Sequence, residues 1–158
     1  MARHVFLCPM RWSDMDAYGH VNNVVFVRYL EEARIDLLLT AAGPAGRAML
    51  DNGVVVVRHE IDYLAPLLFR TEPVVVDTWV THVGRTSYSV SYEVREGGDD
   101  TVYARAATVM VCVDLATGQP RPIDAEMRAA LGQFVDDGAI ADGDARVADL
   151  VGDPSGER

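Results

Sequence analysis

The chain has 158 residues, of which 49% are apolar and 24% charged, so it suits one domain with a buried core and is not a disordered acidic polymer. Its 24 acidic and 14 basic residues give a formal charge of −10, and this balance, without clustered cations to neutralise phosphates, argues against nucleic acid as a partner. Every basic residue is arginine, and the absence of lysine excludes a Schiff base, a pyridoxal phosphate anchor and a P-loop.

The first predicted element is a short apolar strand over residues 4–12, which ends in a loop rich in serine, aspartate and glycine. A long helix follows over residues 23–42, where apolar side chains recur at helical spacing. Asn22 or Asn23 supplies the capping side chain at its start. Because a glycine–proline pair at 43–44 is a usual stop signal, we expect a loop there.

Four further strands are predicted from runs of β-branched and aromatic residues: 54–64, 73–83, 87–95 and 101–114. Asp124 then caps a short helix that extends to about Val135. The element order therefore predicts an α+β architecture, in which one long helix covers one face of an antiparallel sheet of about five strands.

The chain divides into a predicted domain over residues 1–135 and an acidic tail over residues 136–158. The tail holds seven acidic and two basic side chains with interspersed glycine, so we expect it to be flexible. No run approaches the roughly 18 apolar residues of a membrane span, and the N-terminus lacks a signal-like core, so we expect a cytoplasmic protein with no membrane contact. Cys8 and Cys112 lie far apart in apolar runs and are expected to be buried free thiols.

Reactive side chains are concentrated in residues 11–23, directly before the long helix. Free backbone N–H groups and the positive end of the helix dipole gather at that helix start. They would polarise a carbonyl oxygen and stabilise the oxyanion formed on attack more strongly. Asp16 could act on the other side of that carbonyl, as a nucleophile or as a base on water. The residues thus fit an acyl-transfer site, although Asp16, Gly19 and Asn22 also fit a plain turn and helix cap.

The longer string at residues 16–23, Asp-Ala-Tyr-Gly-His-Val-Asn-Asn, resembles the hotdog-fold acyl-CoA thioesterases of the 4-hydroxybenzoyl-CoA thioesterase type. Further matches follow in the same order at 29–34, 61–66 and 84–88, and the resemblance covers about residues 4–135. It implies a long helix wrapped by a curved antiparallel sheet. It also implies that two subunits join their sheets into one, with active sites at the subunit boundary.

The resemblance assigns roles to three residues of the loop. The acidic catalytic group falls on Asp16, and the backbone N–H that polarises the carbonyl falls at or next to Asn23. His20 takes a role in positioning substrate or water. We therefore expect hydrolysis of an acyl-CoA thioester to a carboxylic acid and CoA, with no metal and no cofactor beyond the coenzyme A of substrate and product. The expected partners are acyl-CoA and further copies of the chain, as a homodimer or homotetramer.

Further candidates for substrate binding lie on the predicted strands. Basic side chains suit the phosphates or pantetheine arm of coenzyme A, and the candidates are Arg58, His59 and Arg85. Thr86 and Ser87 are candidate hydrogen-bond donors beside them. Tyr29 and Tyr63 either line the acyl tunnel or belong to the core.

Two other functions stay open at this stage. One is an enoyl-thioester hydratase of the same fold, which usually carries an Asp-x-Asn-Pro-x-His string whose Asn-Pro is absent here. The other is a non-catalytic module that binds acyl thioesters, which the presence of Asp16 disfavours.

Overall fold

The computed structural model describes residues 3–136, so the predicted tail lies outside the described residues except for Asp136. Its helices and strands, in chain order, are β1 His4–Cys8, a 3-10 turn Trp12–Asp14, α1 Asn23–Asp36, a π-helical turn Leu37–Ala41, α2 Gly43–Asn52, β2 Val54–Tyr63, β3 Val74–Val83, β4 Ser87–Arg95, β5 Val102–Cys112 and α3 Ala125–Gly132. None of the described helices is long and apolar enough to cross a membrane.

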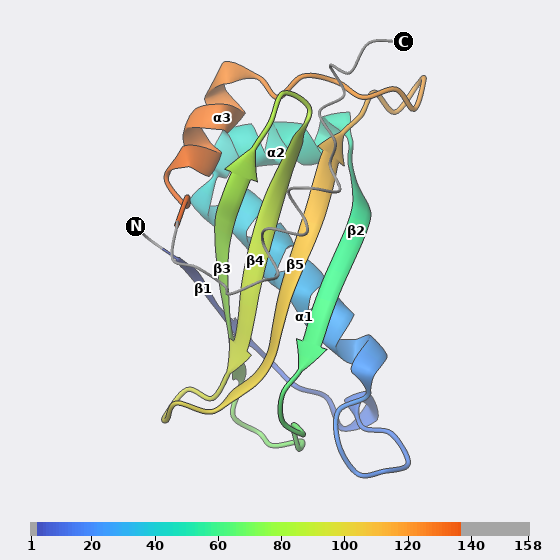
Figure 1. The fold of residues 1–158 in the computed structure, drawn as a ribbon, viewed down its shortest axis with the longest axis vertical. Helices are drawn as coiled ribbons and strands as arrows, with labels where there is room; N and C mark the ends of the chain where they lie inside the picture. The colour runs from blue at the N-terminus through green and yellow to red at the C-terminus, as the bar shows by residue number, and fades with distance from the viewer. Residues whose placement is uncertain (1–2, 137–158) are drawn as a thin grey trace.

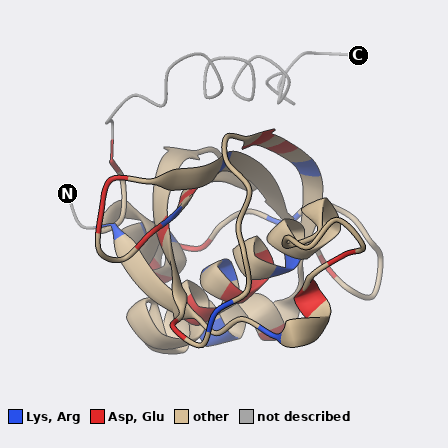
Figure 2. Ribbon diagram, turned by 90° about the horizontal axis from the view of Figure 1, so that it is seen from below, with Lys and Arg blue, Asp and Glu red and all other residues tan. Residues whose placement is uncertain are grey.

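One five-stranded sheet forms the framework, in the spatial order β1-β3-β4-β5-β2. Each neighbouring pair is antiparallel. Figure 1 shows α1 lying across one face of this sheet, and Figure 2 shows the layers end-on, with strands arched over the helices. The predicted α+β architecture of one long helix on an antiparallel sheet is confirmed.

The core lies between α1 and the inner face of the sheet. Alternate residues of β4 that were predicted to share one side are buried against it: Tyr88, Val90, Tyr92 and Val94. The facing stripe of α1 is also buried and consists of Phe26, Tyr29, Leu30 and Ala33. Each large apolar side chain buried in this way stabilises the fold by roughly 1.5–3 kcal/mol. This packing fixes the position of both ends of α1 relative to the strands.

A bulge in β2 decides which of its side chains face α1. The pairing with β5 shifts between Val56 and Arg58, so Val57 is an extra residue. Because side chains alternate along a strand, one inserted residue exchanges the two faces beyond it. Val56 packs toward the core before the bulge, and Ile61 does so after it. Tyr63 therefore also points toward α1.

The expected loop after the glycine–proline pair is wrong, because residues 43–52 form α2. Gly43 has a φ of +56°, a left-handed conformation that breaks the helical path. Pro44 then lies in the first turn of α2, where its missing N–H needs no partner. Gly46 brings α2 close to the preceding turn, since a Cβ there would lie 2.0 Å from the carbonyl oxygen of Leu38.

Replacing Gly46 with alanine should destabilise the protein even though alanine is the better helix former. Helix propensity favours alanine by about 1 kcal/mol, but overlap with a backbone carbonyl forces the helices apart. We expect a net loss of about 1–3 kcal/mol in the free energy of unfolding, measured by urea titration. Gly132→Ala is the matched control, because a Cβ there meets nothing within 4 Å. A Gly46→Ala variant as stable as Gly132→Ala would contradict the close approach.

Candidate active site

A cavity of about 450 Å³ opens where the loop before α1, the start of α1 and the segment after β2 meet. Its walls are largely apolar, with a few polar groups near the helix start. The lining residues are Asp16, Tyr18, His20, Val21, Asn23, Phe26, Tyr63, Leu64, Ala65, Pro66 and Leu67. The cavity thus brings together four residues predicted from the sequence: Asp16, His20, Asn23 and Tyr63.

A tight turn in the loop places Asp16 beside His20. The Asp16 N–H donates to the His20 carbonyl at 3.0 Å, and the Gly19 N–H donates to the Asp16 carbonyl at 3.0 Å. Gly19 has a φ of +81°, which a residue with a Cβ rarely adopts. The Val21 N–H donates to the Leu67 carbonyl at 2.7 Å and ties the loop to the opposite cavity wall. The turn therefore holds the loop against the segment that follows β2.

Both carboxylate oxygens of Asp16 have hydrogen-bond donors. Oδ1 accepts from the Tyr18 N–H at 2.9 Å, and Oδ2 accepts from Asn22 Nδ2 at 3.2 Å. One donor is backbone within the turn and the other is the side chain of the residue before α1. The carboxylate is thereby oriented at the cavity wall instead of extending into solvent.

The N-terminus of α1 leaves one backbone donor available at the cavity. Asn22 Oδ1 accepts from the Val24 N–H at 2.9 Å, and the Asn22 carbonyl accepts from the Val25 N–H at 2.9 Å. Within residues 3–136, no protein group accepts from the Asn23 N–H. Because this N–H lies at the positive end of the helix dipole, it suits an oxygen that gains negative charge.

Asp14 and Tyr29 support the loop from inside the protein. Both are buried, and the Tyr29 hydroxyl donates to Asp14 Oδ2 at 2.6 Å. The Arg11 N–H donates to the same oxygen at 2.9 Å, and the Asp14 carbonyl accepts from the Asn22 N–H at 2.9 Å. Burial, together with the hydrogen bond to Asp14, raises the pKa of Tyr29 far above its ordinary value, so the hydroxyl stays a donor. Tyr29 therefore stabilises the loop through Asp14. It is not among the residues that line the cavity.

Tyr63 stands between the cavity and a second hollow. Its hydroxyl donates to the Asn23 carbonyl at 2.9 Å, and its ring packs edge-on against Phe26 with centroids 5.4 Å apart. Beyond it lies a hollow of about 320 Å³ lined by Asn23, Val24, Val27, Arg28, Glu31 and Tyr63. The two spaces share Asn23 and Tyr63, so the start of α1 is accessible from both sides.

The other predicted substrate-binding residues lie away from this cavity. Arg58 pairs with Glu60 at 2.9 Å, and His59 Nδ1 lies 2.8 Å from the Thr108 hydroxyl oxygen. Burial and the nearby charge of Arg34 lower the pKa of His59. Residues 85–87 belong to the turn between β3 and β4 and the start of β4, at the end of the sheet opposite the start of α1 (Figure 1). Their roles in binding coenzyme A stay predictions.

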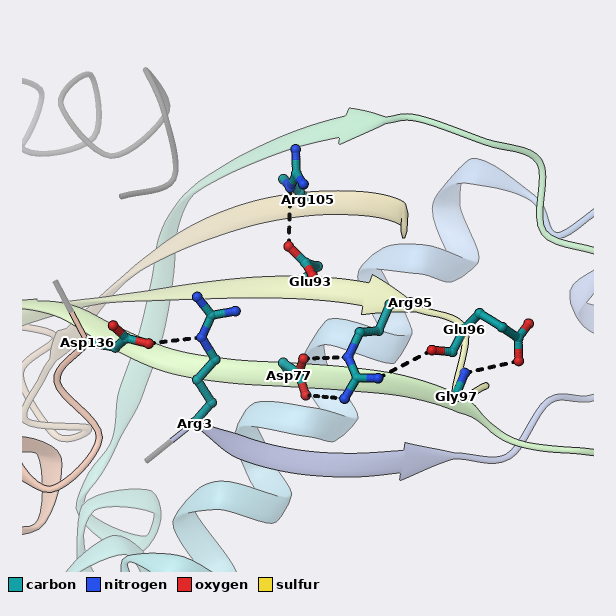
Figure 3. A network of polar contacts seen from close by, with 8 residues as sticks. All are labelled: Arg3, Asp77, Glu93, Arg95, Glu96, Gly97, Arg105 and Asp136. Atoms are coloured by element: carbon teal, nitrogen blue, oxygen red, sulfur yellow. Dashed lines mark hydrogen bonds and ion pairs between the residues drawn. The ribbon is translucent and has the colours of Figure 1, made fainter. Parts of the chain in front are cut away.

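Arginines on the outer face of the sheet are paired with carboxylates (Figure 3). Arg95 binds both oxygens of Asp77, at 2.6 and 3.2 Å. Arg105 lies 3.2 Å from Glu93. Charges of both signs are interspersed over the described elements in Figure 2. These two arginines therefore form ion pairs within the sheet.

The two cysteines do not line the cavity described above. Cys8 and Cys112 are buried free thiols, as predicted. Burial, with the charges of Glu32 and Asp14, raises the pKa of Cys8 to about 12, so it stays a protonated thiol at neutral pH. No group of three or more His, Cys, Asp or Glu side chains in the described residues is arranged to hold a metal ion.

The sequence did not single out Asp14 or Phe26. An aspartate in a loop has the same signature whether its side chain is buried or exposed, so only the contact with Tyr29 distinguishes Asp14. Phe26 belongs to the apolar stripe of α1, and that pattern alone indicates core packing and not a cavity wall.

Known proteins share this fold and sequence pattern. A family model described as the thioesterase-like superfamily matches residues 10–131. The long-chain acyl-CoA thioesterase FadM of Escherichia coli (strain K12) is 28% identical over 126 residues, which make up 80% of this chain and 95% of FadM.

Solved structures give the same result. A thioesterase from Thermus thermophilus, complexed with coenzyme A and Zn, has a TM-score of 0.69 and 29% identity, covering 87% of this chain and 96% of that one. PA2801, a putative thioesterase from Pseudomonas aeruginosa, has a TM-score of 0.71 and 31% identity, covering 81% and 97%. YbaW, a probable thioesterase from Escherichia coli, has a TM-score of 0.71 and 27% identity, covering 84% and 99%.

The hydrogen bond between Tyr29 and Asp14 should contribute measurably to stability. Tyr29→Phe leaves the buried carboxyl group of Asp14 without its shortest donor, and we expect a loss of about 1–3 kcal/mol in the free energy of unfolding. Tyr63→Phe removes a hydroxyl whose bond to Asn23 is exposed, and we expect a loss below about 1 kcal/mol. Urea unfolding followed by circular dichroism compares the two variants. Equal losses would show that Tyr29 is not a special support of the loop.

Proposed function

Since the chain belongs to the thioesterase-like superfamily, we propose that it hydrolyses an acyl-CoA thioester to a carboxylic acid and CoA at the Asp16 cavity. The chain is a thioester hydrolase with the hotdog arrangement of one long helix on a curved sheet. Coenzyme A as the thiol part is supported by the name of FadM and by the coenzyme A complex of the Thermus thermophilus thioesterase. The observation that carries the mechanism is that Asp16 and Asn23 line one cavity, and that the Asn23 N–H has no acceptor within residues 3–136.

The thioester carbonyl binds at the start of α1 in this proposal. Its oxygen accepts from the Asn23 N–H, and attack on the carbonyl carbon converts that oxygen into an oxyanion. A fixed donor at a helix N-terminus interacts more strongly with the oxyanion than with the neutral carbonyl. This difference lowers the barrier to reaction instead of only tightening substrate binding.

Asp16 acts on the carbonyl carbon in one of two ways. As a base, it takes a proton from water while the water oxygen attacks; Asp16 then gives this proton to the sulfur as the C–S bond breaks, and CoA leaves as the thiol. As a nucleophile, its carboxylate displaces CoA and forms a mixed anhydride, which water then hydrolyses to the carboxylic acid and free Asp16. Both routes use protein groups and water alone.

The remaining lining residues bind and orient substrate. His20 lies in the cavity wall and stacks on Tyr18, with ring centroids 6.3 Å apart, where it positions substrate or water. Val21, Phe26 and Leu67 provide apolar surface for the acyl group. Their burial of apolar area favours an acyl chain over a charged group.

A second copy of the chain is proposed to pair along β2. Among the described elements β2 pairs only with β5, so its other edge has free backbone groups. Val55 and Val57 on this strand are 41% and 57% exposed. An apolar, unpaired edge strand favours association with another strand. Pairing there would extend the sheet, and Arg58 and His59, which belong to β2, would then lie at the subunit boundary.

Asp16→Asn should abolish most of the activity without unfolding the protein. Thiol release from a panel of short, medium, long and aromatic acyl-CoAs identifies the substrate, and we expect the variant to lose about 100-fold or more in rate. Asp51→Asn is the control, because this carboxylate is exposed at the end of α2 and has only a surface contact with Arg47. Thermal unfolding confirms equal folding of both variants.

The other outcomes separate the alternatives. Retention of the wild-type rate by Asp16→Asn would contradict the catalytic role of Asp16. Tight acyl-CoA binding with no thiol release would favour a binding module. Hydration of an enoyl-CoA without thiol release would favour a hydratase.

Val57→Lys should weaken the proposed association. A charge on the β2 edge opposes strand pairing, so we expect a lower mass than the wild type by size exclusion with light scattering, together with a lower rate of thioester hydrolysis. Val5→Lys is the matched control, since Val5 is 52% exposed on β1 at the opposite edge of the sheet. An unchanged mass for Val57→Lys would exclude β2 as the site of pairing.

A further inference from the structure

Asn22 lies between the two groups that the proposed mechanism uses. Its Oδ1 accepts from the Val24 N–H at 2.9 Å, which caps α1. Its Nδ2 donates to Asp16 Oδ2 at 3.2 Å. A single side chain therefore joins the start of the helix to the carboxylate.

Asn22 also determines which backbone donor remains for a ligand. Its side chain occupies the Val24 N–H, and its own carbonyl occupies the Val25 N–H. The Asn23 N–H has no acceptor within residues 3–136. The cap thus satisfies the helix while leaving one N–H at the cavity.

A carboxylate next to a helix N-terminus is itself a good cap. Without Asn22, the free N–H groups of Val24 and Asn23 would attract Asp16 into the place that a substrate oxygen must occupy. The amide of Asn22 prevents this because it offers an acceptor to the helix and a donor to the carboxylate. The Tyr18 N–H holds the other oxygen of Asp16 from within the turn.

The backbone of Asn22 is fixed as well. Its N–H donates to the carbonyl of Asp14, whose side chain is held by the buried hydroxyl of Tyr29. The side chain of Asn22 therefore starts from a rigid position, and its two hydrogen bonds can orient Asp16 relative to the helix.

We propose that Asn22 is a positioning residue for thioester hydrolysis and not only a helix cap. It reserves the Asn23 N–H for the thioester oxygen and directs Asp16 at the carbonyl carbon. This inference rests on the proposed function of Asp16. An aspartate at position 22 keeps the acceptor for the helix but loses the donor, so the two roles can be separated by substitution.

Asn22→Asp is the decisive variant. It keeps the cap, so we expect thermal stability close to wild type, but it leaves Asp16 Oδ2 without a donor and adds a second negative charge. We expect kcat/KM to fall about 10- to 100-fold, the range typical when a group that orients a reacting residue is lost. The loss should fall on kcat more than on KM, because orientation of Asp16 at the carbonyl carbon matters in the transition state and not for binding of the acyl-CoA. The other titratable groups lining the cavity, Tyr18, His20 and Tyr63, are unchanged.

Two further variants separate capping from positioning. Asn22→Ala loses both hydrogen bonds and should lose stability as well as rate. Asp124→Ala removes the cap of α3, where the Asp124 side chain accepts from the Met127 N–H at 2.8 Å. It should lower the midpoint of thermal unfolding and keep the wild-type rate.

An Asn22→Asp variant with wild-type kcat and KM would overturn the positioning role and leave only a cap. Should that variant fail to fold, Asn22→Ser restores a capping hydroxyl that is too short to reach Asp16, and it must show the same loss of rate. If Asp16→Asn is inactive while both variants match the wild type, only the role of Asn22 fails. If Asp16→Asn keeps its activity, the proposed function of Asp16 fails first.

Discussion

The buried hydrogen bond between Tyr29 and Asp14 is the constraint on which the cavity depends. Tyr29 lies on the apolar stripe of α1, so its position is set by packing against the sheet. Its hydroxyl must find a partner because a buried polar group without one destabilises the fold. Asp14 provides that partner, and its carbonyl then holds the N–H of Asn22. The packing of the core thereby fixes the position of Asn22, the residue directly before the helix.

The opposite wall of the cavity depends on a second constraint, the bulge in β2. Without the extra residue, the side chains beyond Val57 would exchange faces, and Tyr63 would point away from α1. With it, the Tyr63 hydroxyl reaches the Asn23 carbonyl and its ring packs on Phe26. The helix start is therefore held from the loop side and from the strand side at once.

The sequence predicts most of the fold because its signals are local. Alternation along residues 87–95 and helical spacing from residue 23 identify β4 and α1. A short polar side chain before an apolar helical pattern predicts a cap at Asn22 or Asn23, and the structure places it at Asn22. The α2 helix is missed because Gly43-Pro44 stops one helix and starts another with the same residues. Contacts such as Tyr29 with Asp14 join residues 15 apart. No local pattern specifies such contacts. For the same reason, the sequence does not reveal that Arg85 lies far from the cavity, at the other end of the sheet.

The start of α1 must meet two demands that oppose each other. A helix is most stable when every N–H of its first turn has a partner, whereas polarising a substrate requires one that is available. Asn23 is exposed, so water can satisfy its N–H in the free protein and the stability lost is small. A thioester that displaces this water also fills the cavity with its apolar acyl group. The hydrogen bond from the Asn23 N–H to the thioester oxygen then forms in a less polar medium, where it is stronger. Capping Val24 through Asn22 while leaving Asn23 open thus serves the fold and the proposed chemistry with the same residues.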